Sequence, residues 1–215
     1  MARCSVVTVN ALDQGCILTP ERYTTSSRKP KEDSILLREL CEIKRETLSP
    51  KKSEDSVPYL VLDTGDVKDG FIRLKPVVNA SEIGSTKKVA KIGDIIISRL
   101  RPYLRQVGYI DKELMDALPD NTIILCSTEF FILRSNSDIS YLAPFLLTSA
   151  VQETLNQSQE GGHHPRFNQS ILENIGCSEV FLKTKQAISL EFKNAILNLR
   201  RGESSIFSLL KKLDA

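Results

Sequence analysis

Short runs of apolar residues separated by turn-forming residues dominate the chain between residues 57 and 134. Each run is too short to present one face of a helix and is rich in Ile, Val and Leu, which is typical of buried strands. The pattern predicts strands at Ile95–Ile97, Gln106–Ile110, Thr122–Leu125 and Phe130–Leu133. Two further β-prone runs around Gly65 and Gly70 predict a hairpin or a strand–loop–strand unit.

The segments on either side of these strands have different patterns. Residues 1–33 contain one short β-prone run and end in polar residues, so we expect a loosely packed lead-in. After Ser34, apolar residues through Ile43 suit a short helix that continues as a strand. Residues 139–157 look helical, with Asp138 as the expected N-cap and Pro144 near enough to the start to be tolerated.

A second short helix is expected after Asn168, which is suited to cap it, and before Gly176, where it should stop. A further strand is predicted to follow and to extend to Leu182.

The C-terminal residues carry the most regular pattern in the chain. Apolar or small residues recur at alternating steps of four and three, at Ile188, Phe192, Ala195, Leu199, Gly202, Ile206, Leu209 and Leu213. This heptad spacing predicts a helix from Thr184 to Leu213, about 45 Å long. The stripe must pack either on the rest of the chain or on a partner helix, and its regularity favours a partner. Gly202 is its weak position, because Gly costs about 1 kcal/mol relative to Ala in a helix.

The composition is that of an ordinary soluble globular protein, with 26% charged residues, 41% hydrophobic residues and a net charge of +2. No apolar run approaches the roughly 20 residues that span a bilayer, and the N-terminus is a poor signal peptide. The cysteines are scattered without a C-x-x-C pair, at Cys4, Cys16, Cys41, Cys126 and Cys177. They are interpreted as reduced thiols, so a cytoplasmic protein is expected.

Positive charge is concentrated between Ser85 and Ile110. Six basic residues lie there, Lys87, Lys88, Lys91, Arg99, Arg101 and Arg105, against Asp94 as the sole acid. In a strand, positions 99, 101 and 105 would share one face. Such a stripe suits DNA, since Lys and Arg displace counterions from phosphates and Arg also binds guanine. A solvated strand end would have the same appearance.

The segment EGGHHPRFN is a second candidate for contact with DNA. Its glycines allow close approach of the backbone to a ligand, and His163, His164, Arg166 and Asn168 can all hydrogen-bond to DNA. A mobile surface loop without a ligand is the alternative. A metal site is not expected, because adjacent histidines point apart and no third ligand stands at a suitable spacing.

The sequence contains no recognisable catalytic motif. A methyltransferase tetrad, a P-loop and a nuclease core are all absent, and Glu42-Ile43-Lys44 is better explained as a charged helix end. We therefore expect neither catalytic residues nor a cofactor.

Several segments, taken in order, resemble a known family. They are LLRELCEIKRE, KVAKIGDIIISRLRPYLRQVGYI, STEFFILR, YLAPFLLTSAVQETL and GGHHPRFNQSILENI. From about Leu36 to Leu213 the chain resembles the target recognition domain of type I restriction-modification specificity subunits. The resemblance implies an α/β (α+β) fold, with a twisted, mostly antiparallel sheet and flanking helices, followed by a long coiled-coil helix.

The resemblance also implies a division of the chain and a set of partners. Residues 34–183 would form the recognition domain and residues 184–215 the long helix. Double-stranded DNA and a methyltransferase subunit would be the partners, often with a restriction subunit. Family members usually have two recognition domains and two long helices, whereas this sequence has one of each. The hypothesis is therefore a half-size subunit that directs an adenine methyltransferase and reads a bipartite site as a homodimer. The alternative is an interaction protein that binds restriction-modification subunits without reading DNA.

Overall fold

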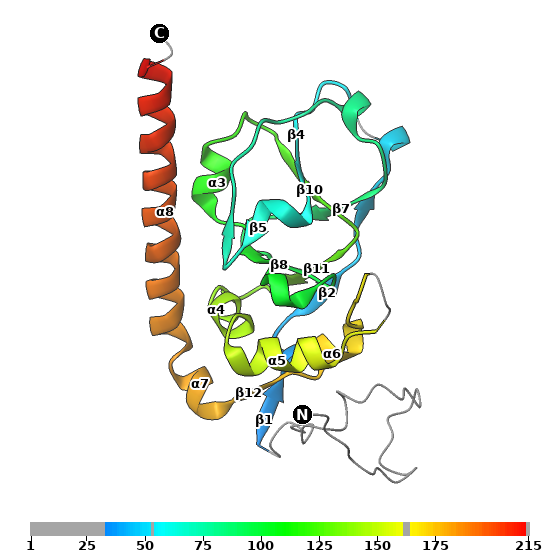
Figure 1. Cartoon of the computed structure of the whole chain (residues 1–215), viewed down its shortest axis with the longest axis vertical. Helices are drawn as coiled ribbons and strands as arrows, with labels where there is room; N and C mark the ends of the chain where they lie inside the picture. The colour runs from blue at the N-terminus through cyan, green and yellow to red at the C-terminus, as the bar shows by residue number, and fades with distance from the viewer. Residues whose placement is uncertain (1–32, 53, 161–163, 214–215) are drawn as a thin grey trace, which may run out of the picture.

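The computed structural model describes residues 33–52, 54–160 and 164–213. A four-stranded antiparallel sheet lies at the centre of the fold (Figure 1). Its strands, in spatial order, are β2 (Glu42–Lys44), β11 (Phe130–Arg134), β8 (Ile95–Ser98) and β9 (Val107–Tyr109). The apolar runs that predicted strands at 95–97, 106–110 and 130–133 are therefore confirmed as strands.

A second four-stranded sheet packs against the first. It contains β3 (Thr47–Leu48), β7 (Lys87–Ala90), β10 (Ile123–Cys126) and β4 (Tyr59–Leu62), in this order. All its pairs are antiparallel except β10 with β4. Two small antiparallel pairs complete the strands, β1 (Ser34–Leu36) with β12 (Gly176–Ser178) and β5 (Val67–Lys68) with β6 (Phe71–Ile72). The predicted hairpin turns at Gly70, whereas Gly65 lies in the 3-10 turn η3 (Thr64–Asp66).

The alternation of side chains along a strand explains why the central sheet is apolar on both faces. Ile95 and Ile97 pack with the flanking helices, while Ile96 between them packs against the second sheet. In the second sheet Ile124 faces the central sheet, and Leu125 faces an outer cluster. Each such fully buried side chain contributes about 1.5–3 kcal/mol to folding. The interior therefore consists of three apolar clusters, one on each face of the central sheet and one on the outer face of the second sheet.

The short helices cover the face of the central sheet that Ile95 and Ile97 occupy. They are α2 (Leu37–Leu40), α4 (Leu142–Leu146), α5 (Ser149–Gln157), α6 (Gln169–Glu173) and α7 (Glu179–Lys183), while α3 (Lys112–Asp116) lies beside the second sheet. Three further 3-10 turns are η2 (Pro50–Lys52), η4 (Ala80–Glu82) and η5 (Pro102–Leu104).

Three details differ from the predicted elements. The helix expected over residues 139–157 is divided, because Thr148 is extended and its Oγ1 donates to the Phe145 carbonyl at 2.8 Å. Pro144 is not the cause, since it lies in the first turn of α4, where the missing N–H needs no partner. Asp138 accepts a hydrogen bond from Ser140 N in the turn before α4 and is not its N-cap. The strand predicted up to Leu182 ends at Ser178, whose side chain caps α7.

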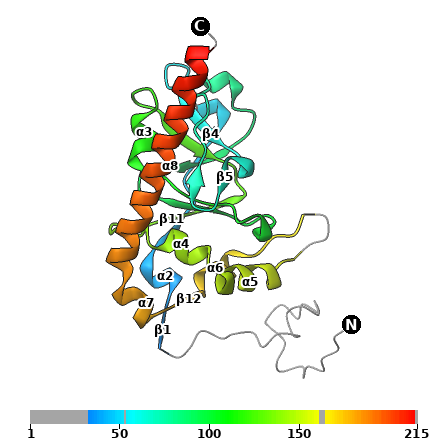
Figure 2. The same ribbon diagram turned by 60° about the vertical axis from the view of Figure 1, so that its left-hand side comes forward.

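Helix α8 (Lys185–Leu213) confirms the long C-terminal helix and stands along one side of the molecule (Figures 1 and 2). The fold class is thus the expected α+β type with mostly antiparallel sheets and flanking helices. The division at 33/34 and 183/184 stays a prediction, and residues 1–32 lie outside the described part. Within the described residues, no helix is long and apolar enough to cross a membrane.

Candidate nucleic-acid interface

The predicted arginine stripe on one strand face does not form. Strand β8 ends at Ser98, and Arg101 and Arg105 both have left-handed backbones, with φ of 47° and 55°. They flank the turn η5, so the side chain of Arg105 has other partners than those of Arg99 and Arg101. Arg105 Nε donates to Asp69 Oδ1 at 2.7 Å. The two-residue alternation of a strand does not apply to a segment that turns in this way.

Arg99 is instead brought to Arg166 by a shared carboxylate, Glu129, just before β11. Glu129 Oε2 accepts from Arg99 Nε at 3.0 Å and from Arg166 Nε at 2.9 Å, and its Oε1 accepts from Arg166 Nη2 at 2.7 Å. The Arg166 pair is bidentate, which fixes the plane of its guanidinium. Two arginines that lie far apart in the sequence are thus held side by side.

The electrostatics of this cluster follow from these contacts. Hydrogen bonds from Arg166, together with those from Arg99, lower the pKa of Glu129 from 4.5 to about 2, against the opposing effect of its partial burial. Burial is the main cause of a lowered pKa at Lys88, and the nearby charges of Arg99 and Arg45 act in the same direction. One ionised carboxylate therefore faces several cations, and the cluster has a net positive charge.

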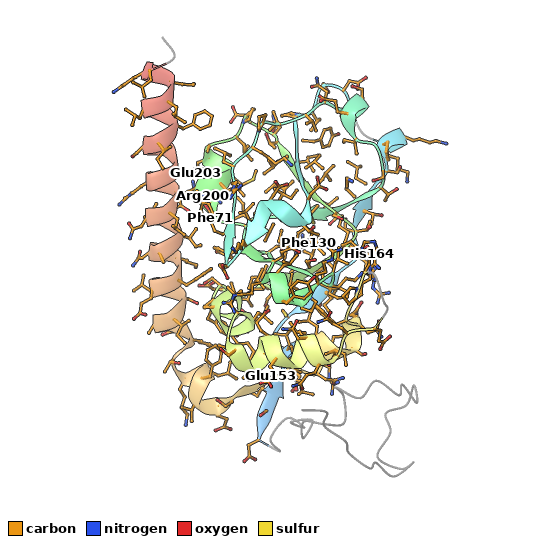
Figure 3. All side chains as sticks on the ribbon, in the orientation of Figure 1. Phe71, Phe130, Glu153, His164, Arg200 and Glu203 are labelled. Atoms are coloured by element: carbon orange, nitrogen blue, oxygen red, sulfur yellow. The ribbon has the colours of Figure 1, made fainter. Side chains whose placement is uncertain are left out.

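Backbone pairing joins the segment after residue 163 to the segment after β8. Arg101 N donates to the Pro165 carbonyl at 3.0 Å, and Phe167 N donates to the Arg99 carbonyl at 3.1 Å. Phe167 is buried, with its ring centroid 5.7 Å from that of Phe131. Next to this bridge, Arg101 Nη2 lies 3.5 Å from His164 Nδ1. The two segments singled out in the sequence thus form one surface, which lies across the molecule from α8 (Figure 3).

The other described residues predicted to contact DNA have partners of their own, and Lys91 lies before β8, at the opposite end of that strand from Arg99. Lys87 Nζ donates to Ser85 Oγ at 3.0 Å, and Lys91 Nζ lies 3.6 Å from Glu46 Oε2. Asn168 is the N-cap residue of α6, as predicted, and its Nδ2 donates to Glu160 Oε1 at 3.0 Å. His163 lies outside the described residues.

Two residues of the cluster were missed in the sequence. Glu129 carried no signal, because a lone acid before a strand is common. Arg45 follows Lys44 at the end of β2, and its Nη2 donates to Gln169 Oε1 at 2.8 Å. The pairing of β2 with β11 brings Arg45 towards the cluster, and that pairing is a tertiary fact. In the described part of the chain, no three His, Cys, Asp or Glu side chains are grouped to hold a metal ion.

The predicted seam on α8 is divided between two environments. Phe192 is half-buried, with its ring 5.9 Å from that of Tyr109, and Ile188 is half-buried at its side. The remaining seam residues, Ala195, Leu199, Ile206, Leu209 and Leu213, are exposed. The face that packs on the rest of the molecule is centred on Ser189, Ile196 and Arg200, next to the seam and not on it.

Buried Arg200 attaches α8 to the domain (Figure 3). Its Nε and Nη2 donate to the two carboxylate oxygens of Asp111 at 3.1 and 2.9 Å, and Nη1 donates to Glu203 Oε2 at 3.0 Å. The guanidinium also lies 4.1 Å from the centroid of the Phe71 ring. Because the helix is held by its adjacent face, the seam from Ala195 to Leu213 stays open to solvent.

No protein-family model matches the sequence, and no curated protein matches it at a significant level. Two solved structures have a similar fold, each 20% identical in sequence with a TM-score of 0.57. One is the crystal structure of the HsdS subunit from Thermoanaerobacter tengcongensis, with 84% of this chain and 46% of that chain covered. The other comes from work on complex assembly and conformational transition of the type I R-M system, with 83% and 45% covered.

This chain therefore spans less than half the length of the structures that it matches. At this level of identity the likeness shows the fold: the chain has the mixed-sheet architecture and long C-terminal helix of a type I specificity-subunit structure.

Proposed function

We propose that this chain is the DNA-reading specificity component of a type I restriction-modification system. The observation that carries the proposal is the grouping of basic side chains from separate segments on one surface of an HsdS-like fold. The residues of that group predicted from the sequence are Lys88, Arg99, Arg101, His164 and Arg166, and Arg45 lies beside them. Such a surface attracts phosphates, and its arginines are suited to pair with guanine in the major groove.

In this proposal the chain does no chemistry itself. It directs a partner adenine methyltransferase to its target and, in complexes that contain one, a nuclease subunit. The basic surface and α8 lie on opposite sides of the molecule (Figure 3). One side can therefore contact DNA while the other contacts a protein, and Arg200 holds the two in a set orientation.

Self-association through α8 is the second part of the proposal. Leu199, Ile206, Leu209 and Leu213 are between 52% and 73% exposed and follow the heptad spacing of a coiled coil. A symmetric dimer formed through this seam would read a bipartite, symmetric DNA site. Sedimentation should give a dimer, and a monomer at tens of micromolar would contradict this part.

A second candidate function is supported by a different observation. Arg99 and Arg166 both donate hydrogen bonds to Glu129, whose negative charge partly neutralises the positive charge available to bind phosphates. A protein that only binds other restriction-modification subunits would keep the same scaffold and need no selectivity for DNA. It would associate with a methyltransferase or a full specificity subunit without preferring any duplex.

Selection of bound duplexes from a random pool separates the two candidates. The full chain is used alone and together with a type I methyltransferase subunit. We expect enrichment of a defined sequence, with an affinity that falls as salt rises. Absence of any enrichment in both arms would rule out DNA reading and leave the interaction protein.

Replacement of Arg101 by Ala should weaken binding to the selected duplex and reduce the salt slope by about 1, since one phosphate contact is lost. Arg166→Ala should also weaken binding. Arg201→Ala is the matched control, because this exposed arginine is on α8, across the molecule. Thermal melting should show that all three variants fold; unchanged DNA binding by Arg101→Ala and Arg166→Ala would remove both residues from the interface.

A further inference from the structure

The turn η5 exposes two large apolar side chains beside the basic surface. Tyr103 is 54% exposed and Leu104 is 41% exposed, whereas Pro102 before them is buried. Outside α7 and α8, the described residues expose only two other large apolar side chains, Ile35 and Ile92. Two neighbouring apolar side chains at the tip of a short turn are therefore a distinct feature of this surface.

The turn is held firmly at both ends. Leu104 N donates to the Arg101 carbonyl and Arg105 N to the Pro102 carbonyl, both at 2.9 Å. The Pro165 carbonyl holds the first end at 3.0 Å, and Asp69 N donates to the Arg105 carbonyl at 3.1 Å at the other. Left-handed backbones at residues other than Gly persist only where the surroundings hold them, and they are frequent at ligand-binding sites. The tip is thus presented in a fixed conformation.

The charge on both sides of the tip indicates what it contacts. Arg101 precedes it, 3.5 Å from His164, and Arg105 follows it. The pair of Arg105 with Asp69 is 42% and 49% exposed, so it is a screened surface ion pair that can exchange for a phosphate. Apolar side chains flanked by cations match a ligand that has stacked flat bases between two rows of phosphates, which is duplex DNA.

We propose that Tyr103, supported by Leu104, inserts as an apolar wedge against the bases of bound duplex DNA while Arg101 and Arg105 contact phosphates on either side. This inference rests on the proposed DNA-reading function and adds a residue that selects sequence without hydrogen bonds. Pyrimidine–purine steps unstack most easily, so the wedge favours such a step at its position in the site.

The test uses the full chain, in the complex that served for the selection, on the duplex selected by the unaltered protein. Tyr103→Ala should weaken binding about tenfold, as expected for the loss of an aromatic–base contact. The slope of log affinity against log salt should not change, because no phosphate contact is lost. Tyr103→Phe should restore affinity to within about twofold of the unaltered protein, because the ring carries the contact.

Ile92→Ala is the matched control. Ile92 is also 54% exposed, but it lies before β8, whereas Tyr103 lies beyond the other end of that strand. It should leave affinity unchanged. With 2-aminopurine placed at successive steps of the duplex, fluorescence should rise at one step with the unaltered chain and with Tyr103→Phe. The rise should be absent with Tyr103→Ala and reduced with Leu104→Ser.

The outcomes are distinct. If the unaltered chain selects a sequence and Tyr103→Ala binds it equally well, or loses affinity through a smaller salt slope, the wedge is wrong and the DNA-reading function stands. A uniform 2-aminopurine signal along the duplex also overturns the wedge. If the unaltered chain selects no sequence, the proposed function itself has failed.

Discussion

The attachment of α8 to the domain can be tested by removing the charge of Arg200. Arg200→Met keeps the length of the side chain, and so its apolar packing, but takes away the guanidinium. The Asp111 carboxylate, whose side chain is only 4% exposed, is then left, within the described residues, with the hydrogen bond that the Leu114 backbone N–H donates to it at 2.8 Å. Helix α8 also loses its contact with the Phe71 ring.

The expected cost is large because a buried charge is left unpaired. Breaking a buried ion pair on one side typically costs about 3–5 kcal/mol, and loss of the cation–π contact adds about 1 kcal/mol. We therefore expect Arg200→Met to lower the free energy of unfolding by about 4–6 kcal/mol. That is a large share of the stability of a typical domain, about 5–15 kcal/mol.

A second substitution, at Asp111, should change stability in opposite directions in the unaltered protein and in the Arg200→Met variant. Asp111 is the N-cap of α3, and Asn is an equally good N-cap residue without the charge. Asp111→Asn should therefore destabilise the unaltered protein but stabilise the Arg200→Met variant by about 1–3 kcal/mol, since it removes the unpaired carboxylate. Non-additivity of this kind is expected for residues in direct contact.

The assay is urea unfolding followed by circular dichroism, with the free energy extrapolated to water. Lys193→Met is the control on the same helix: Lys193 Nζ lies 2.7 Å from Asp138, but the two side chains are 42% and 47% exposed. Loss of that pair should cost less than about 1 kcal/mol. If Arg200→Met also cost less than about 1 kcal/mol, or Asp111→Asn gave no recovery in its background, Arg200 would not be the attachment described.

Three further predictions concern stability. A Cβ at Gly202 would meet no atom within 4 Å, so Gly202→Ala should raise the free energy of unfolding by about 0.5–1 kcal/mol; a lower melting temperature would contradict it. Gly108→Ala should lower the free energy of unfolding by about 1–3 kcal/mol, because its Cβ would lie 2.7 Å from Cγ1 of both Ile72 and Val67. An unchanged urea midpoint would show that β9 shifts to accommodate the added methyl group. The pKa of Glu129 lies below its ordinary 4.5, at about 2, so its ion pairs stabilise the fold fully above pH 4.5 and are lost as the pH falls towards 2. The stability difference between the unaltered protein and Glu129→Gln should therefore shrink between pH 6 and pH 3, and a constant difference would contradict the assignment.

The local pattern of apolar and polar residues was sufficient to predict many of the strands and helices. The apolar runs predicted β8, β10 and β11 to within a residue or two at each end, and the heptad spacing predicted α8 with its start one residue early. These elements are determined by periodicity, which the sequence displays directly. The predictions that failed concern segments where a turn interrupts the pattern, as at Thr148 and after Ser98.

The sequence predicted many of the residues of the candidate site but not how they are grouped in space. The basic residues and the segment after residue 160 were recognised from composition. Their positions next to one another depend on the ion pairs with Glu129 and on backbone pairing between Leu100 and Arg166. Both contacts join residues that lie far apart in the sequence. The sequence suggested one stripe of arginines. The structure shows a cluster that does not include Arg105, which pairs with Asp69 instead.

The sequence by itself determined that this chain is a mixed α and β protein with a long amphipathic C-terminal helix and a basic segment, because these depend on residues near one another in the chain. Only the tertiary structure decided which cations stand together and which face of α8 stays open. The ion pair of Arg200 with Asp111 joins residues on two separate elements and turns the helix so that its seam lies beside the contact with the domain. Contacts of that kind depend on the path of the whole chain, and no spacing within one segment encodes them.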